Sequence, residues 1–263
     1  MKQKISIIGA GAMGGSTAMG LMKSGIIDNS QLMVADPCQD TLSTFKENNV
    51  AVTADNKEAT AFGDIVMVFV KPWLVEKVLT EIKGTFNEHT QTLVVVAAGI
   101  KGEQVKQWMG KDALTAFLAI PNIAIAHLAS MTFLVPIEAD SQHTETVKGI
   151  FDSMGKTIVT EEKLLAAGTT LASCGIAYAM RYIRASVEGG VELGFKAADA
   201  EKIVEQTVKG AVELLQASGE HPEAAIDKVT TPGGVTIRGL NEMEHAGFTS
   251  AVIRGLKAGA SQH

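Results

Sequence analysis

The fold of this chain is decided by its opening stretch, Ile5-Ser6-Ile7-Ile8-Gly9-Ala10-Gly11-Ala12-Met13-Gly14. A short apolar run, typical of a strand, leads into a Gly-x-Gly-x-x-Gly pattern, and apolar residues at helical spacing follow. In such a strand–turn–helix unit, Gly9 permits the tight turn, Gly11 lets a pyrophosphate approach the backbone, and Gly14 lets the helix pack on the strand. The free N–H groups at the helix start favour bound phosphate. The alternative is a turn of small residues that binds nothing. We therefore predict a dinucleotide site formed by Ile8, Gly9, Ala10, Gly11, Ala12, Met13 and Gly14.

Composition narrows the class of protein. The chain has 263 residues, of which 46% are hydrophobic and 20% charged, as expected for one large or two smaller globular domains. Its net charge of -6 argues against a nucleic-acid partner, because phosphate binding needs a basic face. Cys38 and Cys174 are far apart, so we expect neither a disulfide nor a metal site, and a cytoplasmic location. No apolar run approaches the roughly 20 residues that a membrane span needs.

Strands and helices alternate through residues 1–160. We expect strands at 32–35, 64–70, 93–97, 114–118, 131–137 and 156–159, and helices near 41–48, 73–83, 105–109 and 145–154. Continuous apolar runs such as 64–70 are typical of strands buried on both faces of a parallel sheet. The alternation predicts an α/β fold, with a doubly wound parallel (Rossmann) sheet over 1–160 that binds its ligand at the strands' carboxyl ends.

The strand pattern stops after about residue 160. Helical spacing follows at 161–173, 176–191, 198–217, 222–228, 236–244 and 248–259, which predicts an all-helical domain over 161–263. This half is rich in alanine and glycine and short of bulky core residues. We therefore expect it to complete its core against a second copy of the chain, as a homodimer or within a larger ring.

Two polar residues are candidates for the adenosine side of the dinucleotide site. Asp36 ends the second strand, where a carboxylate accepts hydrogen bonds from the ribose of NAD and would repel the 2′-phosphate of NADP. The alternative is a solvated aspartate that caps the loop before Pro37. Asn56, in the polar turn 55–57, could reach the adenosine end.

The ends of the third and fourth strands are candidates for the nicotinamide side. Val70-Lys71-Pro72 and Ala97-Ala98-Gly99 follow these strands, so both fall on the ligand edge of the sheet. Small residues there would let a nicotinamide ring lie against the backbone. For Lys71 the alternative is an ordinary solvated charge.

A second motif lies in the helical half, Thr231-Pro232-Gly233-Gly234-Val235-Thr236. Adjacent glycines directly before a helix can present N–H groups to an anion such as a carboxylate. The alternative, which the pattern alone slightly favours, is an ordinary helix start with Thr236 as its N-cap.

Taken together, these motifs resemble the pyrroline-5-carboxylate reductase family over essentially the full length of the chain. The resemblance rests on the opening glycine turn, Asn56, Val70-Lys71-Pro72, Ala97-Ala98-Gly99-Ile100, Pro121-Asn122, Met131-Thr132, Gly175, Ala177-Tyr178, His221-Pro222 and, most specifically, Thr231-Pro232-Gly233-Gly234-Val235-Thr236. It implies NAD(P)H-dependent reduction of 1-pyrroline-5-carboxylate to L-proline, the last step of proline biosynthesis. It also implies dimers through the helical domain, which are often assembled into decamers.

The resemblance assigns roles to the second motif and exposes departures. It implies that Thr231, Gly233, Gly234, Val235 and Thr236 bind the substrate, and that Thr236 is the catalytic candidate that donates a hydrogen bond to the ring nitrogen. The family usually has arginine where this chain has Leu118, and a different sequence at 172–176. Most members favour NADPH, whereas Asp36 favours NADH.

Other functions remain open at this point. One is reduction of another small cyclic imine, and another is hydroxyacid dehydrogenation. The latter usually needs a lysine on the interdomain helix, where this chain has none before Lys196. A third is a non-catalytic NAD(P)-binding paralogue, for which Leu118 and 172–176 leave room but against which Thr231 and Thr236 argue.

Overall fold

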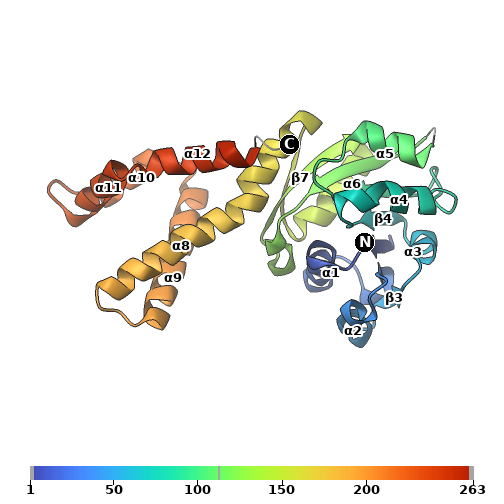
Figure 1. The fold of residues 1–263 in the computed structure, drawn as a ribbon, viewed down its shortest axis with the longest axis horizontal. Helices are drawn as coiled ribbons and strands as arrows, with labels where there is room; N and C mark the ends of the chain where they lie inside the picture. The colour runs from blue at the N-terminus through green and yellow to red at the C-terminus, as the bar shows by residue number, and fades with distance from the viewer. Residues whose placement is uncertain (1–2, 112, 261–263) are drawn as a thin grey trace. The chain divides into compact units, whose positions relative to one another are not determined.

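Figure 1 shows the computed structural model of the chain, which describes residues 3–111 and 113–260. The chain divides into two compact units, one ending at Ser173 and the other beginning at Cys174. The sequence-based division at residue 160 follows the last strand, whereas contacts within the chain group 161–173 with the first unit.

The first unit alternates strands and helices. Its strands are β1 (Ile5–Ile8), β2 (Leu32–Ala35), β3 (Ala51–Thr53), β4 (Ile65–Val68), β5 (Thr92–Val95), β6 (Ala116–Ile120), β7 (Ser130–Ile137) and β8 (Gly155–Val159). Its helices are α1 (Ala12–Ser24), α2 (Gln39–Glu47), α3 (Asn56–Phe62), α4 (Pro72–Ile82), α5 (Gly102–Met109), α6 (Ser141–Asp152) and α7 (Leu165–Gly168). Short 3-10 turns lie at Asn29–Gln31, Ile123–His127 and Glu162–Leu164, and a π-helical turn at Thr169–Cys174. The single helix expected over 161–173 is thus three short turns.

The strands form one eight-stranded sheet in the order β3-β2-β1-β4-β5-β6-β7-β8. The chain winds outward from β1 to β3 and then returns to β4 on the other side of β1, which creates a switch point between β1 and β4. The expected all-parallel sheet is wrong at one edge, because β7 runs antiparallel to β6 and β8 follows β7 in direction. Only residues 121–129 join β6 to β7, fewer than the dozen or so that a parallel crossover needs.

Helices cover both faces of the sheet, which confirms the doubly wound fold. Side chains of α1, α2 and α6 join one buried apolar cluster, and side chains of α3, α4 and α5 join the other. Central strands such as β4 and β6 contribute alternate residues to the two clusters, as expected for strands buried on both faces.

Two elements of the first unit have no counterpart in the sequence-based expectation. β3 is a strand of only three half-buried residues at the sheet edge. Helix α3 begins at Asn56, where a polar turn was expected, and the side chain of Asp55 caps it by accepting from the N–H of Lys57 at 2.8 Å. Asn56 therefore sits at a helix start with a fixed direction rather than in a loose turn.

The described residues of the second unit form helices and the turns between them, as expected. The helices are α8 (Gly175–Glu192), α9 (Ala197–Ser218), α10 (Pro222–Val229), α11 (Val235–His245) and α12 (Phe248–Ala260). Among its described residues, Ala200 is the single buried side chain, while large apolar side chains such as Leu193 (83% exposed) and Leu214 (71%) face outward. None of the described helices is both long and apolar enough to cross a membrane.

Candidate functional site

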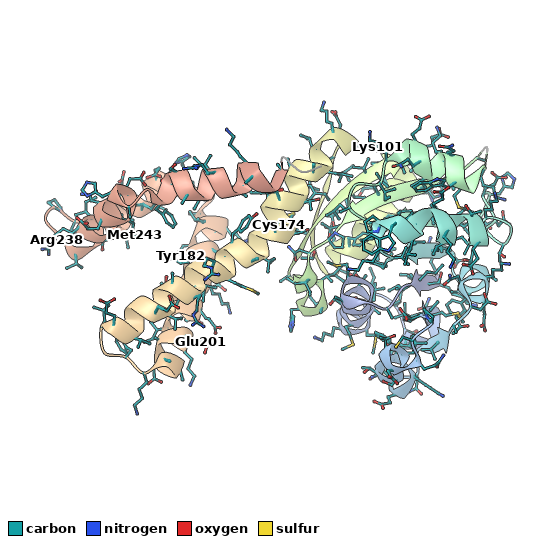
Figure 2. All side chains as sticks on the ribbon, viewed as in Figure 1. Lys101, Cys174, Tyr182, Glu201, Arg238 and Met243 are labelled. Carbon is teal, nitrogen blue, oxygen red and sulfur yellow. The ribbon has the colours of Figure 1, made fainter. Side chains whose placement is uncertain are left out.

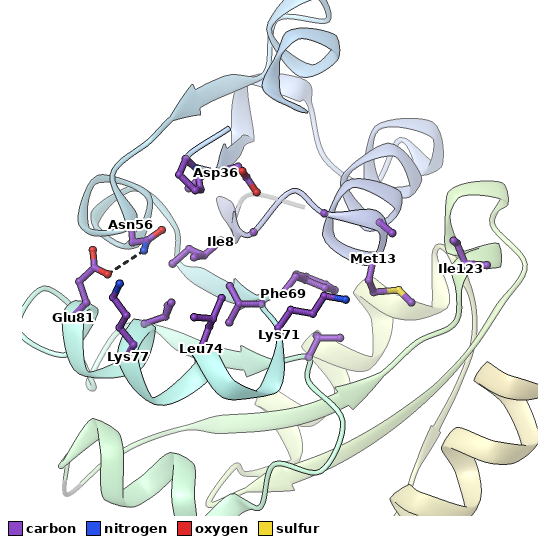
Figure 3. A pocket seen from close by; sticks show the side chains of 18 residues that line it. Ile8, Met13, Asp36, Asn56, Phe69, Lys71, Leu74, Lys77, Glu81 and Ile123 are labelled. Atoms are coloured by element: carbon purple, nitrogen blue, oxygen red, sulfur yellow. Dashed lines mark hydrogen bonds between the residues drawn. The ribbon is translucent and has the colours of Figure 1, made fainter. Parts of the chain in front are cut away.

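A groove with a cavity of about 510 Å³ lies at the carboxyl ends of β1, β2 and β4, beside the switch point (Figure 3). The predicted site residues that line it are Ile8, Gly9, Gly11, Ala12, Met13, Asp36, Asn56, Val70 and Lys71. Ala10, Gly14, Pro72, Ala97 and Ala98 do not line it. The structure thus brings together predicted residues from four separate stretches of the sequence.

The three glycines of the opening turn differ in what surrounds them. A Cβ atom on Gly9, whose φ is 99°, would lie 2.4 Å from the carbonyl oxygen of Phe69. A Cβ on Gly14 would lie 1.9 Å from the carbonyl oxygen of Gly9, so this residue packs the helix on the turn. A Cβ on Gly11 would meet nothing within 4 Å, because Gly11 borders the open groove. These positions fit the three roles that the pattern predicts.

Helix α1 begins at this turn with its N–H groups uncapped. Its N-cap is Gly11, and no side chain bonds there. The first N–H groups of a helix lack partners within the helix and attract anions. The groove therefore has room and donors for the pyrophosphate of a dinucleotide, and the residues present fit that group.

Asp36 is held at the rim of the groove by two backbone donors. Its Oδ2 accepts from the N–H of Ala10 at 2.7 Å, and its Oδ1 accepts from the N–H of Cys38 at 2.9 Å. The carboxylate both caps the loop and lines the groove, so the two interpretations made from the sequence are compatible.

The part of the groove near Asn56 also contains residues that the sequence-based prediction missed. Leu74, Lys77 and Glu81 line the groove from α4. The amide Nδ2 of Asn56 donates to Oε2 of Glu81 at 3.2 Å. The sequence spacing indicates that these residues belong to the groove, because residues 74, 77 and 81 are three and four apart and share one helix face directly after Val70-Lys71-Pro72.

At the other end of the groove, Lys71 is the exposed N-cap of α4, and Val96 and Ile123 approach from the ends of β5 and β6. Ala97 is buried and Ala98 is exposed outside the groove lining. A contact between these two alanines and a nicotinamide ring stays a prediction.

The two departures from the family pattern fall in different environments. Leu118 is 1% exposed and belongs to the apolar core on the α4–α5 face of the sheet. Ala172 and Ser173 bond the loop after β6: Asn122 Nδ2 donates to the carbonyl of Ala172 at 3.3 Å, and Ser173 Oγ donates to the carbonyl of Pro121 at 3.1 Å.

The stretch 231–236 forms a tight turn before α11. Gly234 donates its N–H to the carbonyl of Thr231 at 2.9 Å, with Pro232 second and Gly233 third at φ 69°, as in a type II turn. The Gly234 N–H is therefore engaged and does not point to an anion. The N-cap of α11 is Gly234, so the expected alternative with Thr236 as the cap is wrong. Donors remain at the helix start, on Val235 and Thr236, and Thr236 is exposed.

Cys38 and Cys174 are both free thiols in the structure, Cys38 exposed and Cys174 half-buried. The described residues contain no cluster of three or more histidine, cysteine, aspartate or glutamate side chains that could hold a metal ion.

Comparisons with known proteins match both units. Residues 162–263 match the family model described as pyrroline-5-carboxylate reductase dimerisation, and residues 4–99 match one described as NADP oxidoreductase, coenzyme F420-dependent. The solved structure of a pyrroline-5-carboxylate reductase from Coxiella burnetii covers 100% of this chain and 97% of its own, with 26% identity and a TM-score of 0.91.

Curated relatives extend the match over the full chain. Pyrroline-5-carboxylate reductase 1 of Dictyostelium discoideum is 38% identical over 96% of this chain, although the chain spans only 48% of that protein. Pyrroline-5-carboxylate reductase 2 of the same organism is 34% identical over 99% of this chain and 92% of its own length. The chain therefore belongs to the pyrroline-5-carboxylate reductase family.

Proposed function

We propose that this protein reduces 1-pyrroline-5-carboxylate to L-proline, the last step of proline biosynthesis. The observation that carries the proposal is the groove at the glycine turn in a chain that matches this family over its full length. The substrate is a cyclic imine with a carboxylate, so the site must bind an anion and orient the imine carbon. When bound, the reduced nicotinamide supplies the hydride that this carbon accepts.

The second unit supplies the residues that bind the substrate. The Thr231–Gly234 turn fixes the start of α11, and the N–H groups of Val235 and Thr236 bind the carboxylate there. The hydroxyl of Thr236 donates a hydrogen bond to the ring nitrogen. The ring nitrogen also needs a proton, which comes from water either before hydride transfer or through this hydroxyl. A threonine is a poor acid, so its hydroxyl orients the ring or relays that proton and does not itself titrate near neutral pH. Most of the rate gain then comes from orientation.

NADH is the cofactor that the groove favours. The oxygens of Asp36 are hydrogen-bond acceptors held at the rim by Ala10 and Cys38. They can accept from ribose hydroxyls but repel the added charge of a 2′-phosphate. The solved structure of the pyrroline carboxylate reductase from Plasmodium falciparum has NADP bound. The preference for NADH proposed here is argued from Asp36 of this chain alone.

The second unit forms a homodimer. Its apolar side chains have almost no core within one copy, since Ala200 alone is buried among its described residues. An apolar groove of about 520 Å³ lies between α8 and the α11–α12 pair, and Figure 2 labels Tyr182 and Met243, which line it. A second copy of the same surface is the symmetric way to cover such an area. Assembly of these dimers into a decamer, as the resemblance implies, extends the proposal.

The direct test is to follow nicotinamide absorbance with purified protein and 1-pyrroline-5-carboxylate, with NADH and NADPH in parallel. We expect oxidation of the cofactor with proline as the product, faster with NADH. Thr236→Val is the variant that tests the proposed role of the hydroxyl, because it keeps the shape of the side chain and removes the hydroxyl. Cofactor binding without oxidation of either nucleotide would contradict the proposal, and the same assay with other cyclic imines would then define the substrate.

A further inference from the structure

The side chain of Asn56 has a defined orientation in the groove. Its Nδ2 donates to Oε2 of Glu81 at 3.2 Å, and both residues line the groove (Figure 3). A carboxylate only accepts hydrogen bonds, so the amide nitrogen of Asn56 must be the atom that faces Glu81. The amide oxygen is directed away from Glu81, toward the side of the groove where Asp36 lies.

We infer that Glu81 is a positioning residue that makes the adenosine side of the groove select a ribose 2′-hydroxyl over a 2′-phosphate. With Asn56 held in this orientation, its Oδ1 is an acceptor in a groove that Asp36 also lines, and the two oxygens of Asp36 can each accept a bond beyond those from Ala10 and Cys38. A hydroxyl can donate to these oxygens. A phosphate at neutral pH offers acceptor oxygens and negative charge, so it has no favourable partner there.

Lys77 is the cation that would otherwise assist a phosphate on this side. It lines the same groove, one helical turn before Glu81 on α4. The Glu81 carboxylate therefore offsets the charge of Lys77 as well as holding the amide of Asn56. Replacing Glu81 with glutamine removes the charge and lets the amide of Asn56 turn, because glutamine can donate as well as accept.

The inference rests on the proposed binding of a nicotinamide dinucleotide in this groove, but its test does not require turnover. Dissociation constants for NADH and NADPH are measured by fluorescence titration of the full-length protein and of Glu81→Gln. We expect NADPH to bind about tenfold more tightly to the variant, the gain expected from one hydrogen bond to a charged group, while NADH affinity changes little. The same ratio should shift for adenosine 2′,5′-bisphosphate against AMP, which probes the adenosine side alone.

Glu76→Gln is the matched control, because Glu76 lies on the same helix, is exposed and does not line the groove. It makes the same change in net charge and should leave both affinities unchanged. An equal gain in NADPH affinity in Glu76→Gln would mean that the net charge of the protein alone sets this affinity, and the inference would be wrong.

A double-mutant cycle isolates the orientation of Asn56 from the charge of Glu81. In Asn56→Ala/Glu81→Gln the gain for NADPH should disappear, because the amide that turns is no longer present. A gain that persists without Asn56 would overturn the positioning role and leave only electrostatic release of Lys77. Failure of 1-pyrroline-5-carboxylate reduction with intact nucleotide binding would overturn the proposed function and leave this inference standing.

Discussion

The proposed role of Asp36 in cofactor choice depends on how its side chain is held at the strand end. Its two oxygens already hold the backbone of Ala10 and Cys38, so the carboxylate is fixed before any ligand binds. A ligand group meeting it must therefore donate a hydrogen bond without having to reorder the loop, which lowers the cost of binding.

Replacing Asp36 with serine tests this assignment. Asp36→Ser should weaken NADH binding by about tenfold, the equivalent of one charge-assisted hydrogen bond, and should strengthen NADPH binding. Titration with each nucleotide measures the ratio of the two affinities. Asp40→Ser, an acid in the first turn of α2 that does not line the groove, is the control and should leave the ratio unchanged. An unaltered ratio in Asp36→Ser would remove this residue from the cofactor site.

Residue types with a single physical role were the most predictable part of the site. A Cβ on Gly9 or Gly14 would overlap a carbonyl oxygen, whereas a Cβ on Gly11 would occupy groove space that a pyrophosphate needs. The sequence could not show that the amide of Asn56 is held by Glu81, because that bond joins residues 25 positions apart on two helices. Such pairing depends on how α3 and α4 pack, and no local pattern encodes it.

At the scale of elements, the turn at Thr231–Gly234 fixes where helix α11 begins, because Gly234 is both the last residue of the turn and the N-cap of the helix. The turn uses the Gly234 N–H internally, so the proposed anion site is limited to the donors at the helix start. Proline second and glycine third in a four-residue turn is a recognisable type II pattern, so this use of the Gly234 N–H was predictable from the sequence. The antiparallel β7 was predictable too, from the short connection after β6.

Gly234→Ala tests the turn. An added Cβ would lie 2.4 Å from Thr231 Oγ1 and 3.0 Å from the carbonyl oxygen of Thr231, so the side chain of Thr231 must turn or the start of α11 must shift. We expect the KM for 1-pyrroline-5-carboxylate to rise about tenfold or more through lost orientation, with NADH affinity unchanged. Gly239→Ala, within α11, is the control, because its Cβ meets nothing within 4 Å. Equal losses of substrate and cofactor binding in Gly234→Ala would point to misfolding and against the anion site.

The short elements mark the limit of prediction at this scale. β3 has three half-buried residues, and the apolar run at 50–52 is too short to identify a strand. Helix α3, in contrast, carried a usable signal, since Asp55 is followed three residues later by Glu58, as in a helix N-terminus.

At the scale of the whole molecule, the two units differ in how they are stabilised. The first has two apolar clusters on the faces of its sheet, whereas the second has Ala200 as its single buried side chain among the described residues. The low content of bulky residues predicted this difference from the sequence. The sequence could not identify which helix faces would be covered by a second copy, because every long helix of this half carries an apolar face.

Val252→Glu tests the homodimer. Val252 is 47% exposed on α12 and lines the apolar groove of the second unit, so a charge there would be desolvated in a dimer. We expect sedimentation to show loss of the dimer, with a lower melting temperature. Ser250→Glu adds the same charge two positions away on α12, outside the groove, and should leave the assembly intact. Dimers of unchanged affinity in Val252→Glu would exclude this surface from the interface.

The near absence of a core in the second unit has a kinetic and thermodynamic consequence. If its apolar side chains are buried only between copies, folding of this half follows the law of mass action. Its melting temperature would rise with protein concentration, and its refolding would include a second-order step. Dilution would then favour unfolding of the second unit. The first unit, which has its own apolar clusters, would unfold independently of protein concentration.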